Sequence, residues 1–206
     1  MSIIKLNNQA VKNATEFGSI SSLGSMVFIK KLTASSSATL SFVDGASSVV
    51  LDSTYKEYLF TFNNIHPQTN SVSLQFNMSS DSGSNYNITK TTTYFKAYHN
   101  EAGSASGLIY EASYDLAQST SFQQLTENTG NENDECFVGT MSLFNPSSTT
   151  FVKHFLFKSS EYQHQDYNLS TYVAGYGNTT SAVDAIQFKM SSGNIDAGDI
   201  CLYGIA

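Results

Sequence analysis

The amino-acid sequence predicts an all-β protein, an antiparallel β-sandwich that is jelly-roll-like, with an extended N-terminal arm. Within residues 71–80, the apolar side chains of Val72, Leu74, Phe76 and Met78 alternate with polar ones, which is the pattern of a half-buried strand. Similar runs recur along the chain between turn residues, and no long helical pattern is found. Charged residues make up only 13% of the chain, so uncharged polar groups must coat the sheets.

The first 24 residues differ from the rest because their apolar residues follow no sustained period. Contiguous apolar surface that is left exposed usually marks a contact site. We therefore expect residues 1–24 to form an attachment arm that docks on a neighbouring subunit or another protein, and residues 25–206 to form the sandwich. The alternative is that the segment packs along its own domain. The apolar residues of the predicted arm are Ile3, Ile4, Leu6, Val11, Phe17, Ile20 and Leu23.

Eleven strands are expected after the arm. Turn residues separate many of them, as at Asp44-Gly45, His66-Pro67 and Asn145-Pro146. Residues 115–135 do not fit this pattern, and there we expect a short helical turn at 116–119 followed by a long acidic loop, of a length that is usually functional or contact-forming. The expected strands are 26–32, 38–43, 55–63, 72–78, 87–98, 107–114, 136–144, 150–158, 169–176, 183–190 and 199–205.

Charge excludes one class of partner. The net charge is −7, and all ten basic residues are Lys, so the chain lacks the cationic surface and the guanidinium groups that nucleic-acid binding favours. No apolar stretch reaches the length of a membrane span, so we expect no membrane insertion. The N-terminus lacks the features of a secretory signal, which predicts synthesis in a cytoplasm.

The sequence contains no recognisable catalytic or cofactor motif, and we expect neither an enzyme nor a cofactor. His164 and Asp166 have ligand-like spacing, but two ligands are too few for a structural metal site. The acidic residues 131–135 offer oxygen atoms to Ca²⁺ without the spacing of a calcium loop, so we assign no metal and leave calcium as an alternative. Cys136 and Cys201 are isolated in strand-like runs and are interpreted as two buried thiols, with a disulfide as the alternative.

One cluster has the chemistry of a ligand surface. Flat aromatic rings next to planar polar groups are suited to binding sugars or a neighbouring protein. The simpler interpretation is that alternate tyrosines point into the core and the others are ordinary surface residues. The cluster consists of Tyr162, His164, Asp166, Tyr167, Tyr172 and Tyr176.

Six strings distributed in order over residues 26–206 resemble a known family. They are LDSTYKEYLFTFNNIHP (51–67), TTTYF (91–95), LAQSTSFQQL (116–125), LFNPSSTTFVKHF (143–155), AGYGNTTSAVDAIQFKMSSGNID (174–196) and LYGI (202–205). On these strings the chain looks like a family of virion proteins from tailed bacteriophages, abundant among marine and cyanobacterial phages. The resemblance implies a structural or tail-fibre-like component of the particle and brings no catalytic residues. It is weakest in the N-terminal arm, which varies among such proteins.

We therefore expect a non-enzymatic structural protein on the exterior of a phage particle, made in the host bacterial cytoplasm. Its role would be tail-fibre-like adhesion to a host surface glycan or protein. Its other partners would be virion proteins and further copies of the chain, with a trimer favoured. One alternative is a capsid decoration or cement protein, and another is a carbohydrate-binding lectin or, less favoured, a carbohydrate-active enzyme.

Overall fold

The computed structural model describes residues 26–206, and these residues form an all-β protein. The predicted arm, residues 1–24, lies outside the described residues. One short 3-10 helix, η1 (Ala112–Tyr114), interrupts the strands. The strands are β1 (Met26–Thr33), β2 (Leu40–Val43), β3 (Glu57–Pro67), β4 (Leu74–Ser79), β5 (Lys90–Asn100), β6 (Ser106–Tyr110), β7 (Gln123–Gln124), β8 (Phe137–Phe144), β9 (Lys153–Gln163), β10 (Tyr167–Gly177), β11 (Ala185–Met190) and β12 (Ile195–Ile205).

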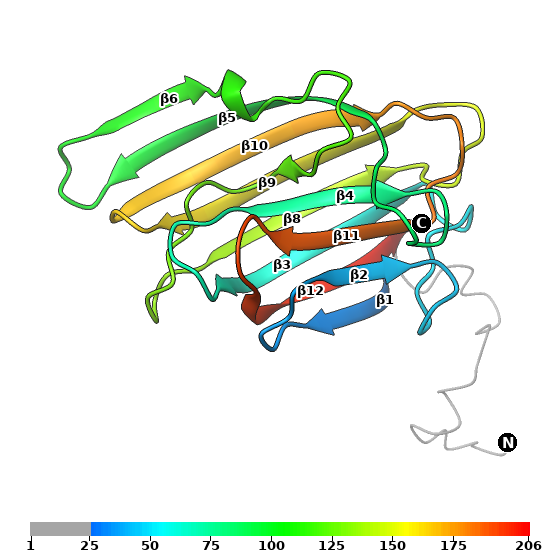
Figure 1. Ribbon diagram of the computed structural model, residues 1–206, viewed down its shortest axis with the longest axis horizontal. Coiled ribbons are helices and arrows are strands. Elements are labelled where there is room, and N and C mark those ends of the chain that lie inside the picture. The colour runs from blue at the N-terminus through cyan, green and yellow to red at the C-terminus, as the bar shows by residue number, and fades with distance from the viewer. Residues whose placement is uncertain (1–25) are drawn as a thin grey trace, which may run out of the picture.

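The strands form two antiparallel sheets that pack face to face. The larger sheet has eight strands in the order β1-β12-β3-β8-β9-β10-β5-β6, and the smaller has four in the order β2-β11-β4-β7. Figure 1 shows the smaller sheet in front of the larger one. The four strands β1-β12-β3-β8 and the four of the smaller sheet together have the strand order of a jelly roll, two Greek keys folded over each other. The predicted jelly-roll-like sandwich is therefore confirmed.

Two hairpins extend this jelly roll on one side. The β9–β10 hairpin follows β8, and the β5–β6 hairpin pairs with β10, so the larger sheet continues for four strands beyond the jelly-roll part. In Figure 1 these strands lie at the top, and β6 forms the edge of the sheet. The extension, strands β9, β10, β5 and β6, makes the larger sheet broader than the smaller one, so the smaller sheet does not cover all of it.

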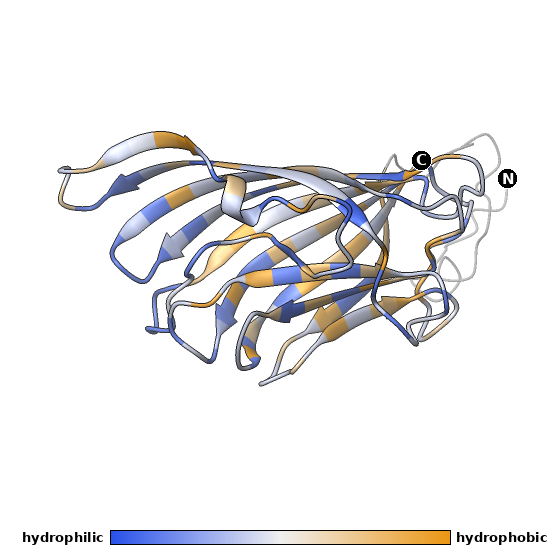
Figure 2. Cartoon of the chain, turned by 45° about the horizontal axis from the view of Figure 1, so that its top comes forward, coloured by the Kyte–Doolittle hydropathy of each residue, from blue (hydrophilic) through white to orange (hydrophobic). Residues whose placement is uncertain are grey.

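Aromatic side chains fill the space between the sheets. Phe188 of β11 lies at their centre, with its ring 5.6 Å from that of Phe60 and 5.1 Å from that of Phe62, both on β3. Phe76 of β4 packs against Phe155 of β9 at 4.8 Å. These pairs join the two sheets, and the apolar bands that recur along the strands in Figure 2 mark the same alternation.

Two expectations about local structure are wrong. The helical turn expected at 116–119 is absent there, and the only helix among the described residues is η1, a few positions earlier. The polar side of β4 is also not a solvent-exposed coat, because Ser73, Asn77 and Ser79 are buried. The reason for the second difference is that other segments cover this strand: the amide nitrogen of Asn77 donates to the carbonyl oxygens of Tyr86 and Thr120.

Candidate functional site

The candidate site is the outer face of the larger sheet, by which we mean the outward side chains of β5, β8, β9 and β10. Strand alternation places every second residue on this face, away from the core. The face contains no aspartate or glutamate, and Lys158 is its only lysine. Its residues are Thr91, Thr93, Phe95, Ala97, His99, Val138, Thr140, Ser142, Phe144, His154, Leu156, Lys158, Ser160, Tyr162, Asn168, Ser170, Tyr172, Ala174 and Tyr176.

Large apolar groups are exposed near the middle of the outer face. The rings of Phe95 and Tyr172 stack in parallel, with centroids 5.0 Å apart and an interplanar angle of 5°. They remain 40% and 43% exposed, and the neighbouring Leu156 is 56% exposed. Burial in a core normally removes such groups from water, so their gathering on one open face indicates a contact surface.

Two hollows of about 400 Å³ each adjoin this aromatic pair. Tyr172 and Lys158 line both of them. One hollow is completed by hydroxyl-bearing side chains, among them those of Thr140 and Ser170. The other is completed largely by apolar groups, including the rings of Phe95 and the side chain of Leu156. The face thus offers aromatic rings, hydroxyl groups and one ammonium group within a short distance of each other.

The structure brings together only part of the predicted tyrosine cluster. Tyr162, Tyr172 and Tyr176 share the outer face, whereas Tyr167 lies on the opposite face of the sheet, 5.9 Å from the ring of Tyr98. None of these tyrosines belongs to the buried core. The cluster is therefore divided between two faces, because residues 167 and 172 differ in strand parity.

The other predicted residues lie in the turn between β9 and β10. The Tyr162 hydroxyl donates to Asp166 Oδ1 at 3.3 Å, and partial burial together with the carboxylates of Glu101 and Asp166 raises the pKa of this hydroxyl to about 12. His164 contacts the chain segment 126–129 instead: its backbone amide donates to the Asn128 carbonyl oxygen at 3.1 Å. The side chains of His164 and Asp166 thus contact different partners, the Asn128 carbonyl oxygen for the His164 ring and the Tyr162 hydroxyl for Asp166.

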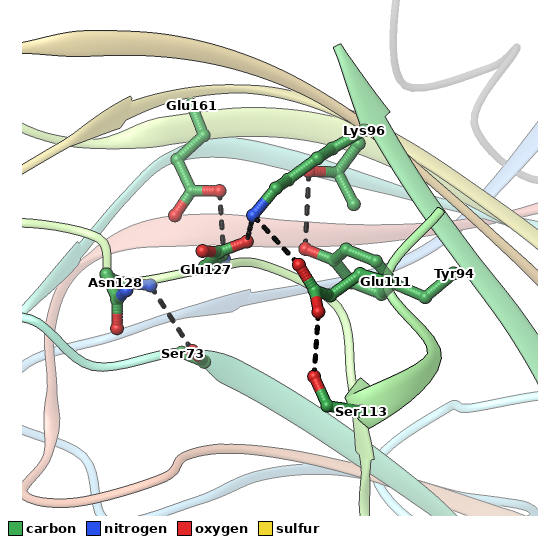
Figure 3. A network of polar contacts seen from close by, with 9 residues as sticks. Ser73, Tyr94, Lys96, Glu111, Ser113, Glu127, Asn128 and Glu161 are labelled. Carbon is green, nitrogen blue, oxygen red and sulfur yellow. Dashed lines mark hydrogen bonds and ion pairs between the residues drawn. The ribbon is translucent and has the colours of Figure 1, made fainter. Parts of the chain in front are cut away.

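A second group of polar residues lies on the inner side of the extension and was not found from the sequence. Lys96 of β5 forms ion pairs with Glu127 and, at 3.6 Å, with Glu111. Glu161 of β9 accepts hydrogen bonds from the Thr129 hydroxyl and, at 3.0 Å, from the backbone amide of Glu127. Figure 3 shows this network converging from β5, β9 and the segment that follows β7. We call it the buried carboxylate network.

The environment of Glu161 decides what this network does. Its side chain is 1% exposed, and burial raises the pKa of its carboxyl group to about 8. A neutral acid beside the ion-paired Glu127 has the form of an acid and base pair. The Glu161 carboxyl is nevertheless closed off from solvent, and both oxygens are occupied by residues 127–129. The arrangement therefore serves to hold this segment against the larger sheet.

Strand parity was the signal that could have located part of this network. Lys90, Tyr94 and Lys96 differ by even numbers of residues, so they share the inner face of β5. Lys90 is fully buried, donates to Asn77 Oδ1 at 2.5 Å, and has its pKa lowered by burial to about 7. A lysine inside an alternating strand is easily taken for a surface residue, because lysine is rarely buried without a partner.

The structure gives no support to the metal alternatives. Among residues 26–206, no cluster of three or more His, Cys, Asp or Glu side chains has the geometry of a metal site. In the acidic segment, Glu135 is buried and accepts a hydrogen bond from the Glu132 amide at 2.6 Å. The thiols of Cys136 and Cys201 are not joined, and Cys201 is buried as expected, whereas Cys136 is only half-buried. No helix in the described part of the chain has the length and apolar character needed to cross a membrane.

Comparisons with protein-family models, with curated proteins and with solved structures gave no significant match. The fold and the open face together define the class to which the described residues belong: an antiparallel jelly-roll sandwich whose larger sheet is extended and uncovered on its outer side.

Proposed function

We propose that this protein is a non-enzymatic structural protein on the exterior of a phage particle, with a tail-fibre-like role in adhesion, and that the outer face of the larger sheet contacts the receptor. The observation that supports this most directly is the exposed pair Phe95 and Tyr172, next to two hollows on a face without carboxylates. The resemblance of six sequence strings to phage virion proteins supports the location.

Contact through this face requires no chemical step. Its aromatic rings offer apolar surface at low cost in conformational entropy, and its Ser and Thr hydroxyls both donate and accept hydrogen bonds. The buried carboxylate network keeps the extension rigid from behind, since it holds residues 127–129 against β5 and β9. A rigid face loses less entropy on binding than a mobile loop does.

A second candidate is a capsid decoration or cement protein. The jelly-roll strand order favours it, because domains of this type occur in viral capsids as well as in lectins. In that case the same face would clamp neighbouring capsid subunits.

Electron cryomicroscopy of intact particles from the phage that encodes this chain separates the two candidates. If the protein has an adhesive role, we expect density for the sandwich in the tail, at a small number of copies per particle. Its presence over the head at high copy number would reject adhesion and favour decoration, and its absence from purified particles would reject both.

The proposal includes a homo-oligomer, with a trimer favoured. Light scattering of the full chain in solution should then give three times the chain mass of 22.4 kDa. A monomeric mass would remove the trimer from the proposal.

A further inference from the structure

The outer face has an unusual charge distribution for a protein with a net charge of −7. The four strands that form it place no carboxylate on it, and Lys158 stands near its centre. Carboxylates lie only at its margin, where they accept hydrogen bonds from hydroxyl groups: Glu57 from Ser142 at 2.6 Å, Asp166 from Tyr162, and Asp115 from Tyr110 on β6. Glu101 also lies near Tyr162. An anionic ligand at the centre of the face would therefore meet Lys158 as the only charged group that these four strands place on it, with the carboxylates confined to the margin.

The ammonium group of Lys158 has no hydrogen-bond acceptor or ion-pair partner among residues 26–206. It lines both hollows of the outer face. Of the lysines that the structure describes, Lys31 and Lys96 are ion-paired, and Lys90 and Lys153 are buried against carbonyl oxygens. Lys30, Lys56 and Lys189 have no ion-pair partner among residues 26–206 either, but none of them belongs to the outer face. Lys158 is thus a cation that is available to a ligand.

Strand pairing sets Lys158 in a straight row of contact groups. Thr140 lies opposite it on β8 and Tyr172 opposite it on β10, and the row continues through Phe95 to Tyr110 on β6. Neighbouring strands lie about 4.8 Å apart, so the row is about 19 Å long. It therefore suits an extended ligand that offers an apolar face, hydroxyl groups and an anionic group in succession.

We propose that this row binds a carboxylate-bearing polysaccharide, with the carboxylate of an acidic sugar at Lys158 and a sugar ring against Tyr172 and Phe95. The inference rests on the proposed function, since it names the receptor chemistry of the same face. Sugars combine apolar C–H faces with hydroxyl edges, which matches rings flanked by Thr and Ser hydroxyls. A charge-assisted hydrogen bond from an ammonium group to a carboxylate adds affinity for the acidic sugar.

Other occupants fit the face less well. A second copy docked symmetrically through the centre of this face would bring two Lys158 side chains toward each other. Nucleic acid requires many cations to neutralise its phosphates, and this face has one lysine. Charge complementarity therefore favours a ligand with well-spaced carboxylates.

The test measures binding of the full chain to three uronic-acid polymers, namely polygalacturonate, alginate and hyaluronan. Fully methyl-esterified polygalacturonate is the matched neutral control, because esterification removes the charge and leaves the sugar rings and their linkage unchanged. We expect binding to at least one of the acidic polymers and at least tenfold weaker binding to the ester. Lys158→Gln should weaken binding by about tenfold, as the loss of one charge-assisted hydrogen bond does, and Lys158→Arg should retain it. Tyr172→Ala should also weaken binding.

Two controls keep the result interpretable. The melting temperature of each variant is compared with that of the original protein, and Lys189→Gln, which changes a half-buried lysine on the smaller sheet, serves as a change of equal charge. The inference is overturned if none of the three polymers binds, if binding is insensitive to Lys158→Gln, or if the variants change only the oligomeric state, which would identify an interface between copies. Binding to the ester that depends on Tyr172 and not on Lys158 would overturn the acidic ligand and leave the proposed adhesive face in place.

Discussion

Buried ionisable side chains are the main feature of this protein at the scale of the residue. Glu161 and Lys90 are both enclosed, and burial moves their pKa values in opposite directions, to about 8 and about 7. Removing a charge from water is costly, so each group favours its neutral form in the folded state. The stability of the protein should therefore depend on pH, and the groups responsible are buried rather than on the surface.

Glu161→Gln tests the first of these groups. The carboxyl pKa is 4.5 when unperturbed and about 8 when folded, so between these values the folded state binds more protons than the unfolded state, and stability falls as pH rises. The amide cannot ionise, so the variant should lose this slope, which is on the order of 1 kcal/mol per pH unit. Urea denaturation at pH 5 and pH 6 measures it, because both values lie below the folded-state pKa of Lys90, about 7. Equal slopes for the variant and the original protein would show that Glu161 is ionised in the folded state.

Phe76→Ala tests the assignment of faces on β4. The ring is fully buried and contacts Phe155 of the other sheet at 4.8 Å. Its removal should lower the free energy of unfolding by about 3–5 kcal/mol, since it leaves a cavity between the sheets. Leu108→Ala is the matched control, because Leu108 is 73% exposed and its truncation should have little effect. A loss below 1 kcal/mol for Phe76→Ala would contradict the packing.

At the scale of the element, the alternation of side chains located all eleven expected strands, with ends that differ by up to five residues. The alternation of apolar and polar residues in a strand is a local property, so it can be recognised directly in the sequence. The helical turn expected at 116–119 is not formed, because tertiary contacts hold residues 115–125 in place. The backbone amide of Lys90 donates to the Ser119 carbonyl oxygen at 2.8 Å, which ties this segment to β5.

Gly175→Ala tests how closely the strands of the extension are packed. Gly175 faces inward on β10, opposite Phe155 of β9. A methyl group here would lie 2.7 Å from the Thr91 carbonyl oxygen and 2.8 Å from the Phe155 ring, so a strand or the ring must shift. We expect destabilisation of about 1–3 kcal/mol. Thermal unfolding measures it, with Ser170→Ala on the outward side of the same strand as the control. An unchanged melting temperature would mean that β10 moves freely against its neighbours.

At the scale of the whole molecule, the two sheets enclose a continuous core built from residues within 26–206. Buried apolar residues come from both sheets, and the aromatic contacts of Phe188 join them. A chain of this length buries enough surface to fold without disulfides or metals.

This core allows us to predict the effect of deleting residues 1–24. The shortened chain should unfold cooperatively and remain soluble, because its buried core is retained, yet it should no longer join the particle if the arm attaches it. Circular dichroism during thermal unfolding and particle assembly with the shortened chain measure the two properties. Loss of folding would show that residues 1–24 contribute to the core, and assembly of a folded shortened chain would reject the attachment role.

The sequence by itself determined the fold class, eleven of the twelve strands and the inward residues of β3, β4 and β11, because strand periodicity and turn residues act locally. It missed the two-residue strand β7, which lies in the segment expected to be a loop. It did not determine which strands become neighbours, since pairing joins residues far apart in the chain. Tertiary structure therefore decided that Lys158, Tyr172 and Phe95 form one row, and that Tyr167 lies on the other face. It also decided that Lys90 and Glu161 are buried, because only the packing of two sheets and a covering segment removes these groups from water.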